Sequence, residues 1–148
     1  IFGLHHDAKQ DKEGVLNAVS LVNALVEREH ELTGVPYEKI ILAGFSQGGA
    51  VALATALHFP QRLGGVLALS TYLPIADELL KSPSDANRQT PILMLHGTQD
   101  TVLTLDIAEL SQQYLQQHNY PVKWKAYPMA HELCAQELVD IAAWFEQM

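Results

Sequence analysis

The segment Gly44–Gly49, Gly-Phe-Ser-Gln-Gly-Gly, constrains the fold of this chain more than any other feature. It follows an apolar run at residues 39–43 and precedes an alanine-rich run at residues 50–56. A buried strand, a tight turn and a helix are the context in which Gly-x-Ser-x-Gly forms a nucleophile elbow, a turn that holds a serine in a strained conformation at its apex. We therefore interpret Ser46 as a nucleophile. The alternative interpretation is a glycine-rich packing turn.

The glycines of this motif are expected to prevent a clash. Gly44 and Gly48 lie where the strand and the helix approach each other, so a side chain at either position should collide with the neighbouring element. The helix that follows directs its first N–H groups and the positive end of its dipole toward the turn. We therefore expect the backbone N–H of Gln47 to donate to the oxygen of a substrate.

Composition excludes several classes of protein. The chain has 148 residues, of which 48% are apolar and 18% are charged, which predicts one globular domain over residues 1–148. A net charge of −8 disfavours binding to nucleic acid or to an anionic membrane. No apolar run is long enough to span a bilayer. The single cysteine excludes an internal disulfide and is compatible with a reducing compartment, so we expect a cytoplasmic protein.

Strands and helices are predicted to alternate along the chain. Apolar runs predict strands at residues 40–45, 63–70, 91–96 and 122–127. Amphipathic periodicity and helix stop signals predict helices at residues 11–32, 105–118 and 132–147, with a short helical stretch around 75–80. Another helix is expected to follow the turn at Ser46 and to end at about residue 58. The last helix is expected to turn one face to the core, made of Cys134, Leu138, Ile141, Ala142 and Phe145. Because each strand is nearly all apolar, we expect an α/β fold in which helices cover both faces of a parallel sheet.

Two chemically active residues follow predicted strands. Asp100 lies in the loop after the strand at 91–96, and His131 lies in the loop after the strand at 122–127. Active sites of such sheets form at the carboxyl ends of the strands, and Ser, Asp, His is a known chain order for a catalytic triad. His131 would accept the proton of Ser46, and Asp100 would orient the imidazole. The alternative interpretation makes Asp100 a turn former and His131 an ordinary residue at a helix start.

The remaining candidates are expected to be structural. His96 is the nearest competitor of His131, but it ends a strand and should support the loop of Asp100. Cys134 should belong to the core rather than react. His5, His6 and Asp7 could bind a metal ion, but nothing elsewhere completes a ligand set, so we expect no metal site.

The sequence resembles the small bacterial carboxylesterases related to acyl-protein thioesterases, within the α/β-hydrolase superfamily. The resemblance covers nearly the whole chain, and its most specific stretches are residues 43–50, 65–74, 95–100 and 127–132. It implies hydrolysis of carboxylic esters or thioesters by Ser46, Asp100 and His131 without a cofactor. It also implies that Leu73 and its neighbours line an acyl pocket, although core packing explains them equally well. One departure is Ala130, where the family usually has glycine.

The resemblance further implies that the chain is truncated. Members of that family carry an additional N-terminal segment with the first strands of the sheet and a loop that supplies a second oxyanion donor. Without that segment, the oxyanion hole would be half complete and residues 40–45 would form an exposed sheet edge, which is prone to association. We therefore expect the edge to pair with a second copy of the chain or with a complementing N-terminal segment.

Three functions remain open. The leading hypothesis is a serine carboxylesterase that hydrolyses small- to medium-chain esters through an acyl-enzyme intermediate. The second is an acyl-protein thioesterase, which would use the same triad. The third, of another class, is a non-catalytic or poorly active fragment without a complete oxyanion hole.

Overall fold

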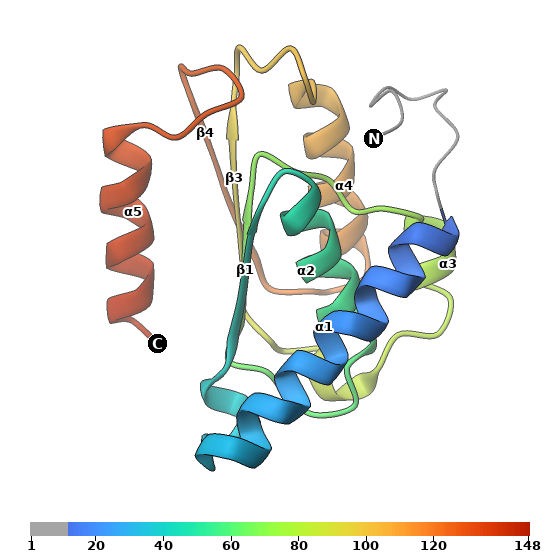
Figure 1. Ribbon diagram of the computed structural model, residues 1–148. Helices are drawn as coiled ribbons and strands as arrows, with labels where there is room; N and C mark the ends of the chain where they lie inside the picture. The colour runs from blue at the N-terminus through green and yellow to red at the C-terminus, as the bar shows by residue number, and fades with distance from the viewer. Residues whose placement is uncertain (1–11) are drawn as a thin grey trace.

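The computed structural model describes residues 12–148 and is built around one sheet (Figure 1). Its strands are β1 (Ile41–Phe45), β2 (Gly65–Leu69), β3 (Ile92–Gly97) and β4 (Val122–Tyr127). They lie in the order β1-β2-β3-β4, and each pair of neighbours is parallel. The prediction of a parallel sheet of about four strands is confirmed. Because all three pairings are parallel, every strand ends at the same edge of the sheet, and the loops that follow the strands gather there.

The helices connect and cover these strands. They are α1 (Lys12–Thr33), α2 (Gln47–His58), α3 (Ala76–Leu79), α4 (Leu105–Gln117) and α5 (Ala135–Glu146), with short 3-10 turns at Tyr37–Lys39 and Asp85–Asn87. Each predicted helix is present, with boundaries that differ by at most three residues. Residue 11, where the first helix was expected to begin, lies outside the described residues.

Side chains of the sheet alternate between two cores. Val66 and Ile92 are register partners and pack with residues of α1, α2 and α4. Leu67 and Leu93 are the next register pair and point to the opposite face, where they pack with Trp144 of α5. Of the helices in residues 12–148, Figure 1 shows only α5 on that face. Burial on both faces explains why the central strands are apolar at nearly every position.

Helix α2 is the most deeply buried helix, since it packs between the sheet and α1 (Figure 1). Every residue from Ala52 to Leu57 is buried, and four of the twelve helical residues are alanines. Small side chains allow close approach on both sides of a helix. The alanine-rich run after the glycine motif therefore places the start of α2 directly against the end of β1.

The buried face of α5 agrees only in part with the predicted one: Cys134 and Ile141 pack against the core on this side of the sheet, whereas Leu138, Ala142 and Phe145 are exposed. Leu138 and Phe145 are 54% and 42% exposed, whereas Trp144 is buried and Glu137 has no exposed surface. The cause lies opposite, at Gly65, where an added Cβ would come within 3.0 Å of the Trp144 ring. The indole ring packs against that bare backbone, and its large apolar area decides how the helix is rotated.

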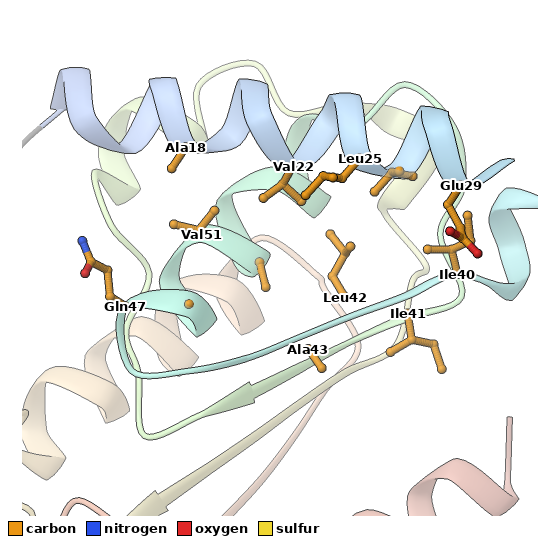
Figure 2. A pocket seen from close by; sticks show the side chains of 13 residues that line it. Ala18, Val22, Leu25, Glu29, Ile40, Ile41, Leu42, Ala43, Gln47 and Val51 are labelled. Atoms are coloured by element: carbon orange, nitrogen blue, oxygen red, sulfur yellow. The ribbon is translucent and has the colours of Figure 1, made fainter. Parts of the chain in front are cut away.

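Strand β1 forms one edge of the sheet. No strand within the described part of the chain pairs with its outer side, as the sequence predicted. An open groove of about 670 Å³ runs between this edge and α1. Figure 2 shows Val22 of α1 facing Leu42 and Val51 across the groove, with Gln47 at one end. Among residues 12–148, no helix is both long and apolar enough to cross a membrane.

Candidate active site

Ser46 lies on a strained turn between β1 and α2. Its backbone angles are φ 54° and ψ −121°, a region that costs a residue with a side chain about 1–3 kcal/mol. The Ser46 N–H donates to the carbonyl oxygen of Leu69 at 2.8 Å. The Ser46 carbonyl oxygen accepts the Thr71 hydroxyl at 2.6 Å and the Ala50 N–H at 3.2 Å. The strand, turn and helix predicted around this serine are therefore present, and both backbone groups of Ser46 are held in place.

Of the two glycines expected to be crowded, Gly44 is crowded and Gly48 is not. A Cβ added to Gly44 would overlap the carbonyl group of Gly48, so no side chain fits there. A Cβ on Gly48 would meet nothing within 4 Å, because this position faces open space. The second crowded glycine is Gly49, where a Cβ would lie 2.7 Å from Cγ2 of Thr71. Close packing therefore involves the helix and the end of β2 as well as the helix and β1.

The structure brings the three side chains predicted for the triad together. Nε2 of His131 lies 3.1 Å from Oγ of Ser46, and Nδ1 of His131 lies 2.6 Å from Oδ2 of Asp100. The side chain of Asp100 is fully buried, whereas that of His131 is 16% exposed. The ring of Phe45 lies 4.8 Å from the imidazole ring between their centroids. The imidazole is thus within hydrogen-bonding distance of a hydroxyl on one side and a buried carboxylate on the other.

The two loops that carry Asp100 and His131 pack directly on each other. The N–H of Gln99 donates to the carbonyl oxygen of Met129 at 3.0 Å. A Cβ added to Gly97 would overlap the carbonyl oxygens of Met129 and Ala130, so only glycine allows this approach. The contact explains how loops after neighbouring strands bring their side chains within 2.6 Å of each other.

Asp100 also fixes its own loop. Its Oδ1 accepts the N–H groups of Val102 and Leu103, each at 2.9 Å, while Oδ2 faces His131. Backbone donors and the imidazole therefore use different oxygens of one carboxylate. The two backbone hydrogen bonds to Oδ1 therefore orient the carboxylate so that Oδ2 faces His131.

His96 supports the loop of Asp100, as the sequence predicted. Its Nε2 lies 2.8 Å from the carbonyl oxygen of Leu103 and 3.5 Å from Oδ2 of Asp100. The imidazole is 1% exposed, and its ring stacks with Trp124. Burial lowers the pKa of His96, with the hydrogen bond to Leu103 and the charge of Asp100 opposing it. A neutral His96 with its proton on Nε2 donates to Leu103 and leaves Oδ2 for His131.

The remaining predicted site residues occupy different surroundings. Gln47 is the first residue of α2, so its backbone N–H has no acceptor one turn earlier in the helix. Leu73 is 4% exposed and packs in the core on the α2 side of the sheet, and its N–H donates to Oγ of Ser111 at 2.8 Å. These contacts agree with core packing, and the acyl-pocket role of Leu73 stays a prediction.

Cys134 is a free, partly buried cysteine that caps α5, and it packs at the margin of the core on the α5 face. Within the described range 12–148, no group of three or more His, Cys, Asp or Glu side chains is arranged to hold a metal ion. His5, His6 and Asp7 lie outside this range.

Sequence reasoning missed Thr71, whose hydroxyl contacts the backbone of Ser46. A polar residue directly after an apolar strand was the only signal. That signal is weak, because such residues are common in turns.

The α/β-hydrolase class is defined by a serine on a strand-to-helix turn of a parallel sheet. A histidine and an aspartate from two later loops at the same end of the sheet complete its site. The sequence matches the phospholipase/carboxylesterase family over residues 1–148. The chain belongs to that family.

Individual relatives agree with this assignment. The chain is 37% identical to acyl-protein thioesterase 1 of Yarrowia lipolytica over 144 residues, which cover 95% of this chain and 63% of the relative. It is 37% identical to a probable carboxylesterase of Oryza sativa over 138 residues, which cover 93% of this chain and 52% of the relative. The chain thus spans between half and two thirds of these relatives.

Solved structures agree on the fold. The crystal structure of SOBER1 from Arabidopsis thaliana has a TM-score of 0.92 and 30% identity, with 99% of this chain and 70% of the other covered. A carboxylesterase of Bacillus cereus has a TM-score of 0.80 at 18% identity, with 97% and 66% covered. The second likeness extends the shared fold to a distant sequence.

Proposed function

We propose that this chain hydrolyses carboxylic esters of small- to medium-chain acids, with Ser46 as nucleophile. The continuous hydrogen-bonded series from Ser46 through His131 to Asp100 carries the proposal. A serine hydroxyl is a poor nucleophile until a neighbouring base accepts its proton, and the imidazole Nε2 is the base within reach. Membership of the phospholipase/carboxylesterase family supports the reaction class.

The reaction proceeds in two halves. Oγ of Ser46 attacks the carbonyl carbon of the ester while its proton passes to Nε2 of His131. The bond to the leaving alcohol breaks, and Nε2 returns the proton to the alcohol oxygen. Water then attacks the acyl carbon and gives a proton to Nε2, the bond from the acyl carbon to Oγ breaks, and Nε2 returns the proton to Oγ. The net reaction consumes one water, and Asp100 stabilises the imidazolium of both halves.

The backbone N–H of Gln47 is proposed to stabilise the oxyanion. It is the first amide of α2, directly after the nucleophile, and it lies at the positive end of the helix dipole. Donors placed where charge develops in the transition state contribute a large share of the rate in acyl transfer. The geometry of the turn supports this role, because the donor and Oγ belong to adjacent residues.

Apolar side chains beside the triad support an acyl substrate. Phe45 is 40% exposed, Val102 is 56% exposed and Leu133 is 46% exposed. Each lies within two residues of a triad member in the sequence, and the Phe45 ring lies 4.8 Å from the imidazole of His131 between their centroids, so the segments that carry the triad also carry exposed apolar side chains. This surface suits the hydrocarbon part of an ester, and Leu73 is proposed to extend it as a pocket residue.

Covalent labelling tests the proposal directly. The chain of residues 1–148 is treated with a fluorophosphonate, and the labelled peptide is identified by mass spectrometry. We expect label on Ser46 and hydrolysis of p-nitrophenyl butyrate, both lost in Ser46→Ala, whose thermal unfolding should match that of the parent. Label at another residue, or hydrolysis by Ser46→Ala, would contradict the assignment of the nucleophile.

An acyl-protein thioesterase is the second candidate. The observation that favours it is the 37% identity to the thioesterase of Yarrowia lipolytica over 95% of this chain. The triad chemistry is the same, with a thiol as the leaving group. Parallel assays on a short aryl ester and a palmitoylated protein separate the two, since a higher kcat/KM on the protein substrate favours the thioesterase. Absence of both activities and of labelling would favour a non-catalytic binding protein.

We also propose that the outer edge of β1 pairs with another strand. The edge is apolar and lies beside the groove along α1, and unpaired edges associate readily. For the chain of residues 1–148 in isolation, the partner would be a second copy. A complementing N-terminal segment supplied separately would compete for the same edge.

A further inference from the structure

We propose that Thr71 is a positioning residue for the nucleophile. Its hydroxyl holds the carbonyl group of Ser46 and thereby fixes the strained turn that presents Oγ to His131. The inference rests on the proposed function, in which Ser46 attacks the substrate, and extends it to a residue on a different strand connection.

Two separate contacts join Thr71 to the elbow. The chain leaves β2 through Ser70, which has a positive φ of 49°, and Thr71 follows with 1% of its surface exposed. Its Oγ1 donates to the carbonyl oxygen of Ser46 at 2.6 Å. On the other branch of the side chain, Cγ2 lies 2.7 Å from the place where a Cβ on Gly49 would be. The hydroxyl therefore holds the turn, while the methyl group packs on the first turn of α2.

The position of these contacts makes them relevant to Oγ. The Ser46 N–H is bound to Leu69 at the end of β2, and the Ser46 carbonyl is bound to Thr71 two residues later. Both backbone groups of the strained residue are thus tied to the neighbouring strand connection. The hydrogen bond from Oγ to His131 spans 3.1 Å, and misplacement of a reacting group by about 1 Å lowers rates by as much as 10²-fold. Release of the carbonyl should therefore reduce the reactivity of Ser46 before it affects substrate binding.

Three variants separate the hydroxyl from the methyl group and from general stability. Thr71→Val removes the hydroxyl and keeps the shape, and Thr71→Ser keeps the hydroxyl and removes the methyl group. Thr55→Val is the matched control. Thr55 is also buried, in helix α2, and its Oγ1 donates to the backbone carbonyl oxygen of Val51 at 2.8 Å. It lies nine residues beyond Ser46, well away from the triad.

Two measurements are made on each variant. The first is reactivity, as kcat and KM for p-nitrophenyl butyrate and the rate of fluorophosphonate labelling. The second is hydrogen exchange of the peptide spanning residues 44–51, followed by mass spectrometry, which requires no activity. For Thr71→Val we expect kcat and the labelling rate to fall roughly 3- to 10-fold, the ratio typical of one hydrogen bond, with KM unchanged. Exchange in the elbow peptide should accelerate, and Thr71→Ser should restore both properties.

The outcomes are distinct. Parental labelling and parental elbow exchange in Thr71→Val would overturn the proposal, as would equal losses in Thr71→Ser or in Thr55→Val. If Thr71→Val does not fold, Thr71→Ser alone tests the proposal. A more than tenfold loss of kcat in this variant, or faster hydrogen exchange of its peptide 44–51, would also overturn the proposal. If the parent chain is not labelled at Ser46, the proposed function fails. The exchange comparison then still decides whether Thr71 holds the turn.

Discussion

Asp100 and His131 meet through one oxygen of the carboxylate, at 2.6 Å from Nδ1, while the other oxygen holds two backbone amides. Asp100→Asn can keep the amide contacts by placing its carbonyl oxygen there. Its NH₂ group then faces the imidazole and favours the tautomer that cannot accept the proton of Ser46.

For Asp100→Asn we expect kcat to fall on the order of 10³–10⁴-fold with little change in the melting temperature. Ester turnover and thermal unfolding of the same preparation check this. Asp106→Asn is the control, because Asp106 is an exposed acid in the first turn of α4. Full activity of Asp100→Asn together with loss in Asp106→Asn would reassign the acid of the triad.

His96 should make the protein sensitive to mild acid. Burial lowers the pKa of His96 in the folded chain, whereas an unfolded histidine titrates near about 6.5. Between these two values the unfolded state binds more protons, so the free energy of unfolding is highest above about pH 6.5 and falls as the pH drops through this window. His96→Gln retains a donor for Leu103 and removes the titration. Between pH 8 and pH 5, the melting temperature should fall more steeply with decreasing pH for the parent than for His96→Gln. An equal fall in both proteins would contradict the prediction.

Glu137 should change the free energy of unfolding in the opposite direction, lowering it as the pH rises. Burial raises its pKa, and the N–H of Cys134 only partly offsets this. Its Oε1 has no hydrogen-bond partner among the described residues. A raised pKa means that the carboxyl group stabilises the fold below its unfolded value of about 4.3 and loses that contribution as the pH rises through the folded value. Glu137→Gln should therefore raise the melting temperature by a few degrees at pH 8, and less at pH 5. A gain that does not depend on pH would argue against ionisation as the cause.

A charge on the edge of β1 should weaken self-association. Ala43 is exposed on this strand, and lysine on an edge is a common protection against pairing. We expect the chain of residues 1–148 to associate in light scattering and Ala43→Lys to shift it toward the monomer. Ser20→Lys adds the same charge on an exposed position of α1 and should leave association unchanged. A monomeric parent at micromolar concentration would contradict the pairing.

The sequence patterns predicted the elements because their signals are local. The strand before Ser46 and the helix after it are marked by apolar runs and by glycines at a tight turn. Asp100 and His131 could be predicted for a related reason, since parallel strands place their following loops at one end of the sheet. A chemical residue type in such a loop is therefore informative without any knowledge of packing.

Rotation of a helix and contacts between distant side chains carry no such local signal. Periodicity identified the inward face of α5 only in part, because Trp144 packs against the bare backbone of Gly65, which no local pattern indicates. A buried Glu137 is contrary to the ordinary preference of charged residues for solvent. The bond from Thr71 to Ser46 joins residues 25 positions apart, and nothing in either residue type indicates it.

The parallel order β1-β2-β3-β4 has a consequence for refolding. The elbow is contiguous in sequence, but Ser46 and His131 are 85 residues apart. In the sheet that residues 12–148 form, β2 and β3 lie between β1 and β4. A slip of one residue at any of these three pairings would displace a loop by about 3.3 Å, which is more than a hydrogen bond tolerates. A reactive Ser46 would therefore report that all three registers are correct. The fraction of chains labelled at Ser46 in a refolded sample would therefore measure the fraction of molecules with the native sheet.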